Sequence, residues 1–97
     1  MATYIILINY TDQGIRTIKD SPKRIDAVKK ALKGMGADMK SFHLTMGSYD
    51  AVAVIEAPND ETLAKFLLSV GAQGNVRTNT LKAFDEAGFR KIVKALP

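Results

Sequence analysis

The chain has few residues that can do chemistry, and only one of them is a histidine. His43 can exchange a proton near neutral pH, so it is a candidate general base and a candidate haem or metal ligand. Arg77 and Asn79 stand two residues apart, and a planar guanidinium can hold a carboxylate or phosphate at two points. His43 is therefore the candidate catalytic residue. The candidate ligand-binding residues are Asn9, Thr45, Tyr49, Asp50, Arg77 and Asn79.

Each candidate also has a purely structural interpretation. His43 can be a hydrogen-bonded histidine of a sheet or an interface, Tyr49 can pack beside Met46, and Asp50 can accept hydrogen bonds from backbone amides. An ion pair with a carboxylate is equally open to Arg77. With no cysteine, no second histidine and no Glu-x-x-His spacing, the sequence predicts no metal centre and no cofactor. Haem binding would rest on His43 alone.

The elements that must position these residues follow from hydrophobic periodicity and capping signals. We expect a strand over 3–10 that is buried on both faces, a helical turn capped by Asp12, and a helix from Ser21-Pro22 to about Met35, with Ser21 as its N-cap and Pro22 at its first position. These are followed by two strands within 41–55, a helix from Pro58 to Gly71, a strand over 75–84 and a terminal helix over 85–96. This order predicts an α+β, ferredoxin-like βαββαβ fold: an antiparallel four-stranded sheet with both crossover helices on one face, plus a C-terminal helix. We expect one domain over residues 1–97.

The pair Gly47-Ser48 predicts a two-residue type II′ turn between the two middle strands, because glycine tolerates a positive φ. This register puts Phe42 with Ala53, Leu44 with Ala51 and Met46 with Tyr49 on an apolar face that should lie under the helices. The opposite face then carries His43 with Val52, Thr45 with Asp50, Ser41 with Val54 and Met39 with Glu56.

The sheet face without helices is predicted to be partly apolar, because Val52, Val54 and aliphatic residues of the first strand lie on it. A patch of this kind marks an interaction surface. The simplest cover is a second copy placed sheet to sheet, which predicts a homo-oligomer of at least two chains with polar residues around an internal cleft. In the alternative, the terminal helix folds across the open face of its own chain.

Composition narrows the functional classes. The absence of cysteine fits a reducing compartment, and the longest apolar run, 4–8, is too short to span a bilayer, so we expect a cytoplasmic protein with no membrane partner. The net charge of +4 suggests nucleic acid as one partner to consider, because a basic surface attracts phosphate groups. RNA-recognition folds share the βαββαβ order but stack bases on sheet aromatics, which 5–9 and 51–54 lack, so nucleic-acid binding is not expected.

The chain resembles the GYD domain family. The family's signature motif corresponds to Gly47-Ser48-Tyr49-Asp50 in this chain. The segments 11–15, 19–22, 56–58 and 74–78 are also similar in sequence to segments of the family, and they occur in the same order. The resemblance implies a dimeric α/β barrel of two ferredoxin-like protomers. It implies no particular reaction, since proteins of this architecture include small monooxygenases, lactone isomerases, haem-binding enzymes and effector-sensing domains.

Two hypotheses of different classes follow. In the first, the protein is a non-catalytic homo-oligomeric module that binds a small molecule in the sheet cleft or scaffolds a complex. In the second, it is a small dimeric enzyme, monooxygenase- or isomerase-like, acting on an organic acid, lactone or aromatic compound. His43 would then carry the proton, and Arg77 or Asn79 would hold substrate oxygens. The second hypothesis predicts an enclosed pocket with several convergent polar groups.

Overall fold

Four antiparallel strands form one sheet in the order β2-β3-β1-β4 in the computed structural model, which describes residues 1–97. The strands are β1 (Ala2–Tyr10), β2 (Asp38–Leu44), β3 (Ala51–Ala57) and β4 (Val76–Ala83). The helices are α1 (Asp12–Arg16), α2 (Ser21–Gly34), α3 (Asp60–Ala72) and α4 (Glu86–Lys94), and a 3-10 turn, η1 (Ile18–Asp20), joins α1 to α2. This arrangement confirms the predicted ferredoxin-like βαββαβ fold with a C-terminal helix.

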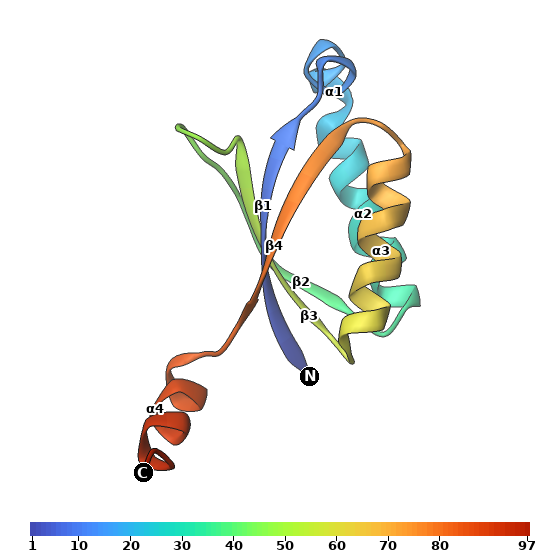
Figure 1. Ribbon diagram of the computed structural model, residues 1–97. Coiled ribbons are helices and arrows are strands. Elements are labelled where there is room, and N and C mark those ends of the chain that lie inside the picture. The colour runs from blue at the N-terminus through green and yellow to red at the C-terminus, as the bar shows by residue number, and fades with distance from the viewer.

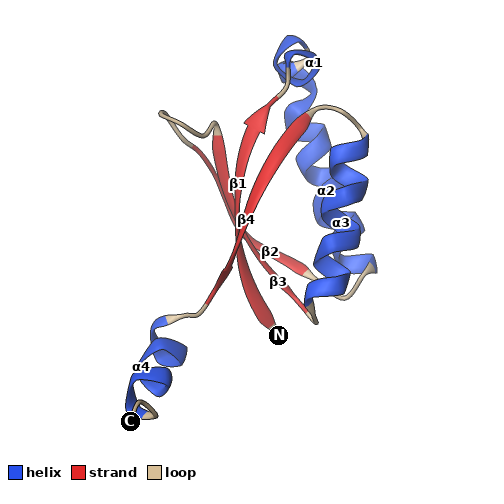
Figure 2. Ribbon diagram, viewed as in Figure 1, coloured by secondary structure: helices blue, strands red, loops and turns tan.

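The two long helices, α2 and α3, cover one face of the sheet, and no helix lies over the other face (Figure 1). Figure 2 shows the same two layers by type of secondary structure. In β1, Tyr4 and Ile6 are buried under the helices, whereas Ile5 and Leu7 point to the other face and are only half-buried. The prediction that this strand is buried on both faces is therefore wrong for a single chain, because nothing in the chain covers the second face.

The core lies between the sheet and the two helices, and the predicted apolar stripes form it. Leu32 of α2 and Leu63 and Phe66 of α3 are buried, because their spacing of three and four residues places each set on one side of its helix. The residues that pack around them from the helices are Val28, Met35, Leu67 and Val70. The sheet contributes Tyr4, Ile6, Ala53, Ile55 and Ala57.

The pairing of β2 with β3 agrees with the predicted register near the hairpin. The observed pairs are Ser41 with Val54, Phe42 with Ala53, His43 with Val52 and Leu44 with Ala51. Ala51 and Ala53 are buried on the helix side, as predicted. Leu44 shares that side but is 74 % exposed, because the tip of the hairpin diverges from α2 and α3 and leaves nothing above it (Figure 1).

The hairpin connection is longer than predicted. Residues 45–50 form a loop rather than a two-residue turn, although Gly47 does adopt a positive φ of 142°. Met46 is 99 % exposed, so the predictions that it pairs with Tyr49 and packs beside it are wrong. The reason is local: the Thr45 hydroxyl donates a hydrogen bond of 2.7 Å to the Tyr49 carbonyl, which holds residues 45–49 in a wider loop.

A β-bulge at Lys40 alters the other end of the hairpin. Met39 pairs with Ile55 and Ser41 with Val54, so Lys40 is an extra residue in β2. Met39 was predicted to lie opposite Glu56 on the face without helices, and this prediction is wrong because the extra residue turns it to the helix side. Lys40 instead pairs with Asp38 at 3.4 Å and with Glu56 at 3.6 Å.

Two predicted helix caps are shifted by one residue. Thr11, rather than Asp12, caps α1, because its hydroxyl accepts a hydrogen bond of 3.0 Å from the Gly14 amide. Asp20, rather than Ser21, occupies the cap position of α2, which leaves Ser21 and Pro22 in the first turn.

The C-terminal helix extends away from the body of the molecule. In Figure 1, α4 lies beyond the end of β4, apart from α2 and α3 and from both faces of the sheet. The alternative in which this helix covers the sheet of its own chain is therefore not observed. None of the helices combines the length and the apolar character needed to cross a membrane.

Candidate functional site on the open face of the sheet

The sheet face opposite α2 and α3, here called the open face, carries most of the candidate site residues. Because side chains alternate along a strand, the residues that neighbour the buried ones point to this face. They are Thr3, Ile5, Leu7 and Asn9 of β1, Ser41 and His43 of β2, Val52, Val54 and Glu56 of β3, and Arg77, Asn79, Leu81 and Ala83 of β4.

The centre of the open face is apolar. Val54, Ile5 and Leu81 lie side by side on three neighbouring strands, and Val52 lies beside Leu7 in the next row. Leu81 is 49 % exposed and the other four are half-buried, although no helix covers them. The register thus produces a continuous aliphatic surface that water contacts in the single chain.

Polar residues gather at one end of this surface. Asn9 and Arg77 are cross-strand partners in β1 and β4. Asn79, the next residue on the same face of β4, donates a hydrogen bond of 3.2 Å from its Nδ2 to the phenolic oxygen of Tyr49. Asn9, Tyr49, Arg77 and Asn79 therefore come together from three separate segments of the chain.

Asp50 and Thr45 hold the loop that carries Tyr49. The Asp50 carboxylate accepts a hydrogen bond of 2.9 Å from the backbone amide of Tyr10, and the Asp50 amide donates one of 2.8 Å to the Ile8 carbonyl. The Thr45 amide donates to the Asp50 carbonyl at 2.9 Å. The two Asp50 bonds extend the pairing of β1 with β3 past the strand ends, and the Thr45 bond does the same for β2 with β3. Both residues therefore have a structural task.

His43 lies apart from this polar group. It is exposed on β2, where it pairs with Val52, and its side chain has no hydrogen-bond partner in the chain. The row that contains His43 continues through Val52 and Leu7 to Asn79 on β4. Three strand spacings separate its ends, about 14 Å. One chain therefore does not bring His43 together with Asn79 or Arg77, which the sequence had placed in one cleft.

The open face holds no arrangement suited to a metal. No three histidine, aspartate or glutamate side chains of the chain gather closely enough to coordinate an ion. An apolar cavity, partly open to solvent, lies on the helix side of the sheet. In a single chain, the open face can thus bind by surface complementarity and by the polar group at its end.

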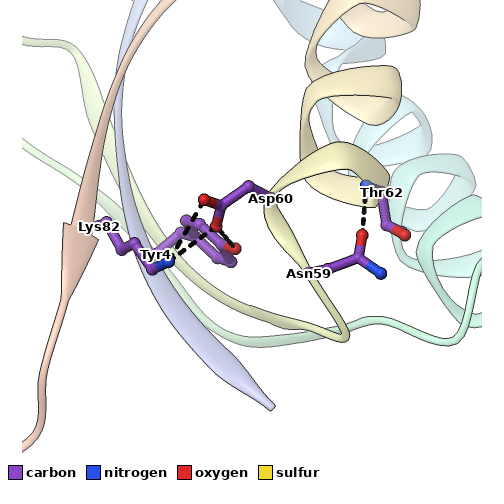
Figure 3. Close-up of polar contacts among 5 residues, drawn as sticks. All are labelled: Tyr4, Asn59, Asp60, Thr62 and Lys82. Carbon is purple, nitrogen blue, oxygen red and sulfur yellow. Dashed lines mark hydrogen bonds and ion pairs between the residues drawn. The ribbon is translucent and has the colours of Figure 1, made fainter.

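One polar cluster was not predicted from the sequence. The Tyr4 hydroxyl donates a hydrogen bond to the Asp60 carboxylate, and Lys82 forms an ion pair of 3.0 Å with the same group (Figure 3). The hydrogen bond to Asp60, with burial second, raises the pKa of Tyr4 to about 12. The bonds from Tyr4 and then Lys82 lower the pKa of Asp60. The cluster lies on the helix side, where it fastens α3 to β1 and β4.

The sequence held only a weak signal of that cluster. Asp60 stands in the first turn of a helix, where acidic residues are common because the helix dipole favours them. Asn59, immediately before it, caps α3 by accepting a hydrogen bond of 2.8 Å from the Thr62 amide (Figure 3). Tyr4 and Lys82 come near the start of α3 because they are cross-strand partners in β1 and β4, and the sequence gives no local signal of that pairing.

The fold and the uncovered sheet define an α+β protein of the ferredoxin-like class with one face open to solvent. Comparison with known families is more specific. The chain belongs to the GYD domain family, which matches it over residues 4–93. The signature residues now have physical tasks, since Gly47 shapes the loop, Tyr49 accepts from Asn79, and Asp50 binds the β1 backbone.

A curated relative of this chain comes from Thermus thermophilus. It is named glutamine synthetase and cystathionine beta-lyase binding protein, and it is 35 % identical over 88 residues that cover 90 % of this chain and 93 % of the relative. That name describes a protein that binds two enzymes.

Solved structures agree on the fold. A Thermus thermophilus protein of known crystal structure is 24 % identical, with a TM-score of 0.54 over 87 % of this chain and 94 % of that chain. A hypothetical protein from Pyrococcus horikoshii is 20 % identical, with a TM-score of 0.56 over 89 % of this chain and 93 % of that chain.

Proposed function

We propose that this protein is a non-catalytic homo-oligomeric binding module, in which two copies pack open face to open face and each presents α4 to a partner enzyme. The observation that carries the proposal is the uncovered aliphatic surface formed by Ile5, Leu7, Val52, Val54 and Leu81. Burial of apolar area drives association, and a patch of this kind is usual on proteins that associate.

Sheet-to-sheet packing suits this surface. Two sheets stack about 10 Å apart, and a standard interface buries about 800 Å² per partner. In such a dimer the aliphatic centres meet, and the polar group of Asn9, Arg77 and Asn79 borders the space between the sheets together with His43 and Thr45. A small polar ligand could bind in that space. The dimer is the dimeric α/β barrel expected of the family.

An enzyme as the partner is supported by the curated relative and by α4. The relative is named for binding glutamine synthetase and cystathionine beta-lyase. In this chain Phe89, Ile92 and Val93 are 60, 45 and 48 % exposed on one side of a helix that stands clear of the body. Amphipathic helices of this type bind into apolar grooves through residues spaced three and four apart.

The alternative, a small dimeric enzyme that uses His43 as a proton carrier, has less support. General acid–base catalysis needs the proton carrier within hydrogen-bond reach of the substrate. This hypothesis uses Arg77 and Asn79 to hold the substrate. Within one chain, the β4 strand that carries them lies about 14 Å across the sheet from His43 on β2. Catalysis at this face would require the partner chain to supply one half of the site.

Native mass spectrometry of protein purified from its host tests the assembly. We expect a dimer, or a multiple of two, for the unaltered chain and a monomer for Val54→Glu, because a buried unpaired carboxylate opposes the interface. Leu68→Glu is the matched control, since Leu68 is 76 % exposed on α3 and lies outside the open face. It should remain dimeric. A monomeric unaltered protein, or a dimeric Val54→Glu variant, would overturn the face-to-face assembly.

Titration calorimetry against the host's glutamine synthetase and cystathionine beta-lyase tests the partner. Saturable binding of either enzyme supports the proposal. Failure of both at micromolar concentrations would overturn the assignment of these enzymes as partners. The same mass spectra report any small molecule that copurifies, by its added mass.

A further inference from the structure

A cavity of about 90 Å³ lies between the sheet and the helices α2 and α3, on the side opposite the proposed dimer interface. Thirteen of the eighteen residues that line it are hydrophobic. They include Ile6, Ala53 and Ile55 from the sheet and Val28 and Phe66 from the helices. Empty space among such side chains destabilises a fold, because the lining atoms lose packing partners.

The space lies where β3 presents a small side chain, Ala53, to the helices. Ala51, Ala53 and Ala57 are almost fully buried on that side, where a strand ordinarily carries valine or isoleucine. Ala53 lines the cavity directly, and its cross-strand neighbour Ile6 lines it as well. A larger side chain at position 53 would extend into this space.

Polar residues line one end of the cavity. At that end of the sheet β1 ends and β4 begins, next to the start of α2 (Figure 1). Arg24 is the one charged residue in the lining. Its guanidinium donates hydrogen bonds of 2.9 Å to the Thr17 hydroxyl and 3.3 Å to the Gly14 carbonyl. Ser21, which is 8 % exposed, lies beside it in the lining.

Arg24 is half-buried and forms no ion pair with a carboxylate of the chain. A guanidinium has five N–H donors, so the two hydrogen bonds fix its position and leave donors free. The start of α2 adds the positive end of a helix dipole at the same place. An apolar space with one fixed and unpaired cation is complementary to a small molecule with an apolar tail and an anionic head.

We propose that this cavity binds a small aliphatic carboxylate, with the tail between Ala53 and Phe66 and the carboxylate at Arg24. The volume limits the tail, because a cavity of roughly 150 Å³ takes a whole benzene ring, so a smaller one takes about four carbons. The inference does not depend on the proposed enzyme partner or on the dimer, since the cavity and the open face lie on opposite sides of the sheet.

Pentanoate is the probe, and heteronuclear NMR of the labelled protein is the measurement. We expect saturable shifts of residues around the cavity and nuclear Overhauser effects between the pentanoate methyl group and the Ala53 methyl group. These effects need no variant. Their absence at saturating pentanoate would overturn the proposed position, and the absence of any saturable shift would overturn the site.

Two variants then separate the tail from the head. Ala53→Val should abolish pentanoate binding because it fills the cavity. Arg24→Gln should weaken pentanoate at least tenfold and leave 1-pentanol binding unchanged. The control is Lys23→Gln, which removes one positive charge from the same helix but lies outside the lining. Equal losses in Arg24→Gln and Lys23→Gln, or full binding by Ala53→Val, would overturn the proposal.

Discussion

The hydroxyl of Tyr4 donates a hydrogen bond to the carboxylate of Asp60, which joins the first strand to the first turn of α3. Lys82, the cross-strand partner of Tyr4 on β4, forms an ion pair with the same carboxylate at 3.0 Å. Two strands of the sheet and one helix therefore meet at Asp60. Since Tyr4 is only 3 % exposed, its ring also fills part of the core beneath that helix.

Tyr4→Phe should lower the stability by about 0.5–1.5 kcal/mol, the net contribution of an ordinary hydrogen bond, because the Asp60 carboxylate is largely exposed to water. The ring is retained, so the packing around it should not change. Urea unfolding followed by circular dichroism measures the difference. Tyr49→Phe is the control, because its hydroxyl accepts a single hydrogen bond at an exposed position. If Tyr4→Phe is as stable as the unaltered protein, the contact contributes nothing.

The same contact predicts a loss of stability in alkaline solution. The pKa of Tyr4 is about 12 in the folded chain and 10.0 in its ordinary environment, chiefly because of the hydrogen bond to Asp60. Above pH 10 the unfolded phenol loses its proton and the folded phenol keeps it. This contribution to stability is therefore complete below pH 10 and is lost as the pH rises through about 12.

The measurement is urea unfolding at several pH values between 9 and 12, with the unaltered protein beside Tyr4→Phe. Lysines and the other tyrosines titrate in both chains, so the difference between the two curves isolates Tyr4. We expect the difference in unfolding free energy to shrink as the pH rises. A difference that stays constant to pH 12 would contradict the assigned shift.

Gly14 predicts a severe steric effect at the other end of the sheet. A Cβ atom at this buried position would lie 2.0 Å from the carbonyl oxygen of Asn75, which accepts a hydrogen bond from the Thr11 amide. Gly14→Ala should therefore destabilise the fold by about 1–3 kcal/mol or more, as overpacking does. In Gly71→Ala the new Cβ has no atom within 4 Å, so this control should be neutral or more stable. Thermal unfolding measures the melting temperatures of both variants. Equal melting temperatures for Gly14→Ala and Gly71→Ala would contradict the predicted clash at Gly14.

The sequence was sufficient for the fold because its signals are local and agree with one another. The buried alternation of β3 and the helical stripes ending in Leu32 and Phe66 each specify an element and the side it buries. The bulge at Lys40 had no such signal, since an extra residue changes the pairing without changing the hydrophobic pattern nearby. The contact of Tyr4 with Asp60 was missed for a related reason: it joins residues 56 positions apart.

The candidate site stays a prediction, although the structure does bring some of its residues together. Arg77 and Asn79 do share one face of β4, and Asn9 lies beside them, because the period of two along a strand is reliable. His43 does not lie beside them in one chain, since the strand order β2-β3-β1-β4 puts His43 and Asn79 on opposite edges of the sheet. The cavity beside Arg24 depends on how far the alanines of β3 let the helices approach, which only coordinates reveal.

The apolar side of α4 gives the most direct prediction about partners. Phe89→Ser combined with Ile92→Ser should leave the fold and the proposed dimer intact, because these side chains are 60 and 45 % exposed and lie outside the core. If α4 docks into a groove of a partner enzyme, this variant should bind that enzyme at least tenfold more weakly, since anchor residues typically contribute more than about 2 kcal/mol each. Titration calorimetry against the enzyme that binds the unaltered protein measures the loss of affinity.

Lys91→Ser, on the polar side of the same helix, is the matched control and should bind within about twofold of the unaltered protein. Unchanged binding by the double variant would place the docking surface elsewhere, and dissociation of the dimer would show that α4 joins the two copies instead.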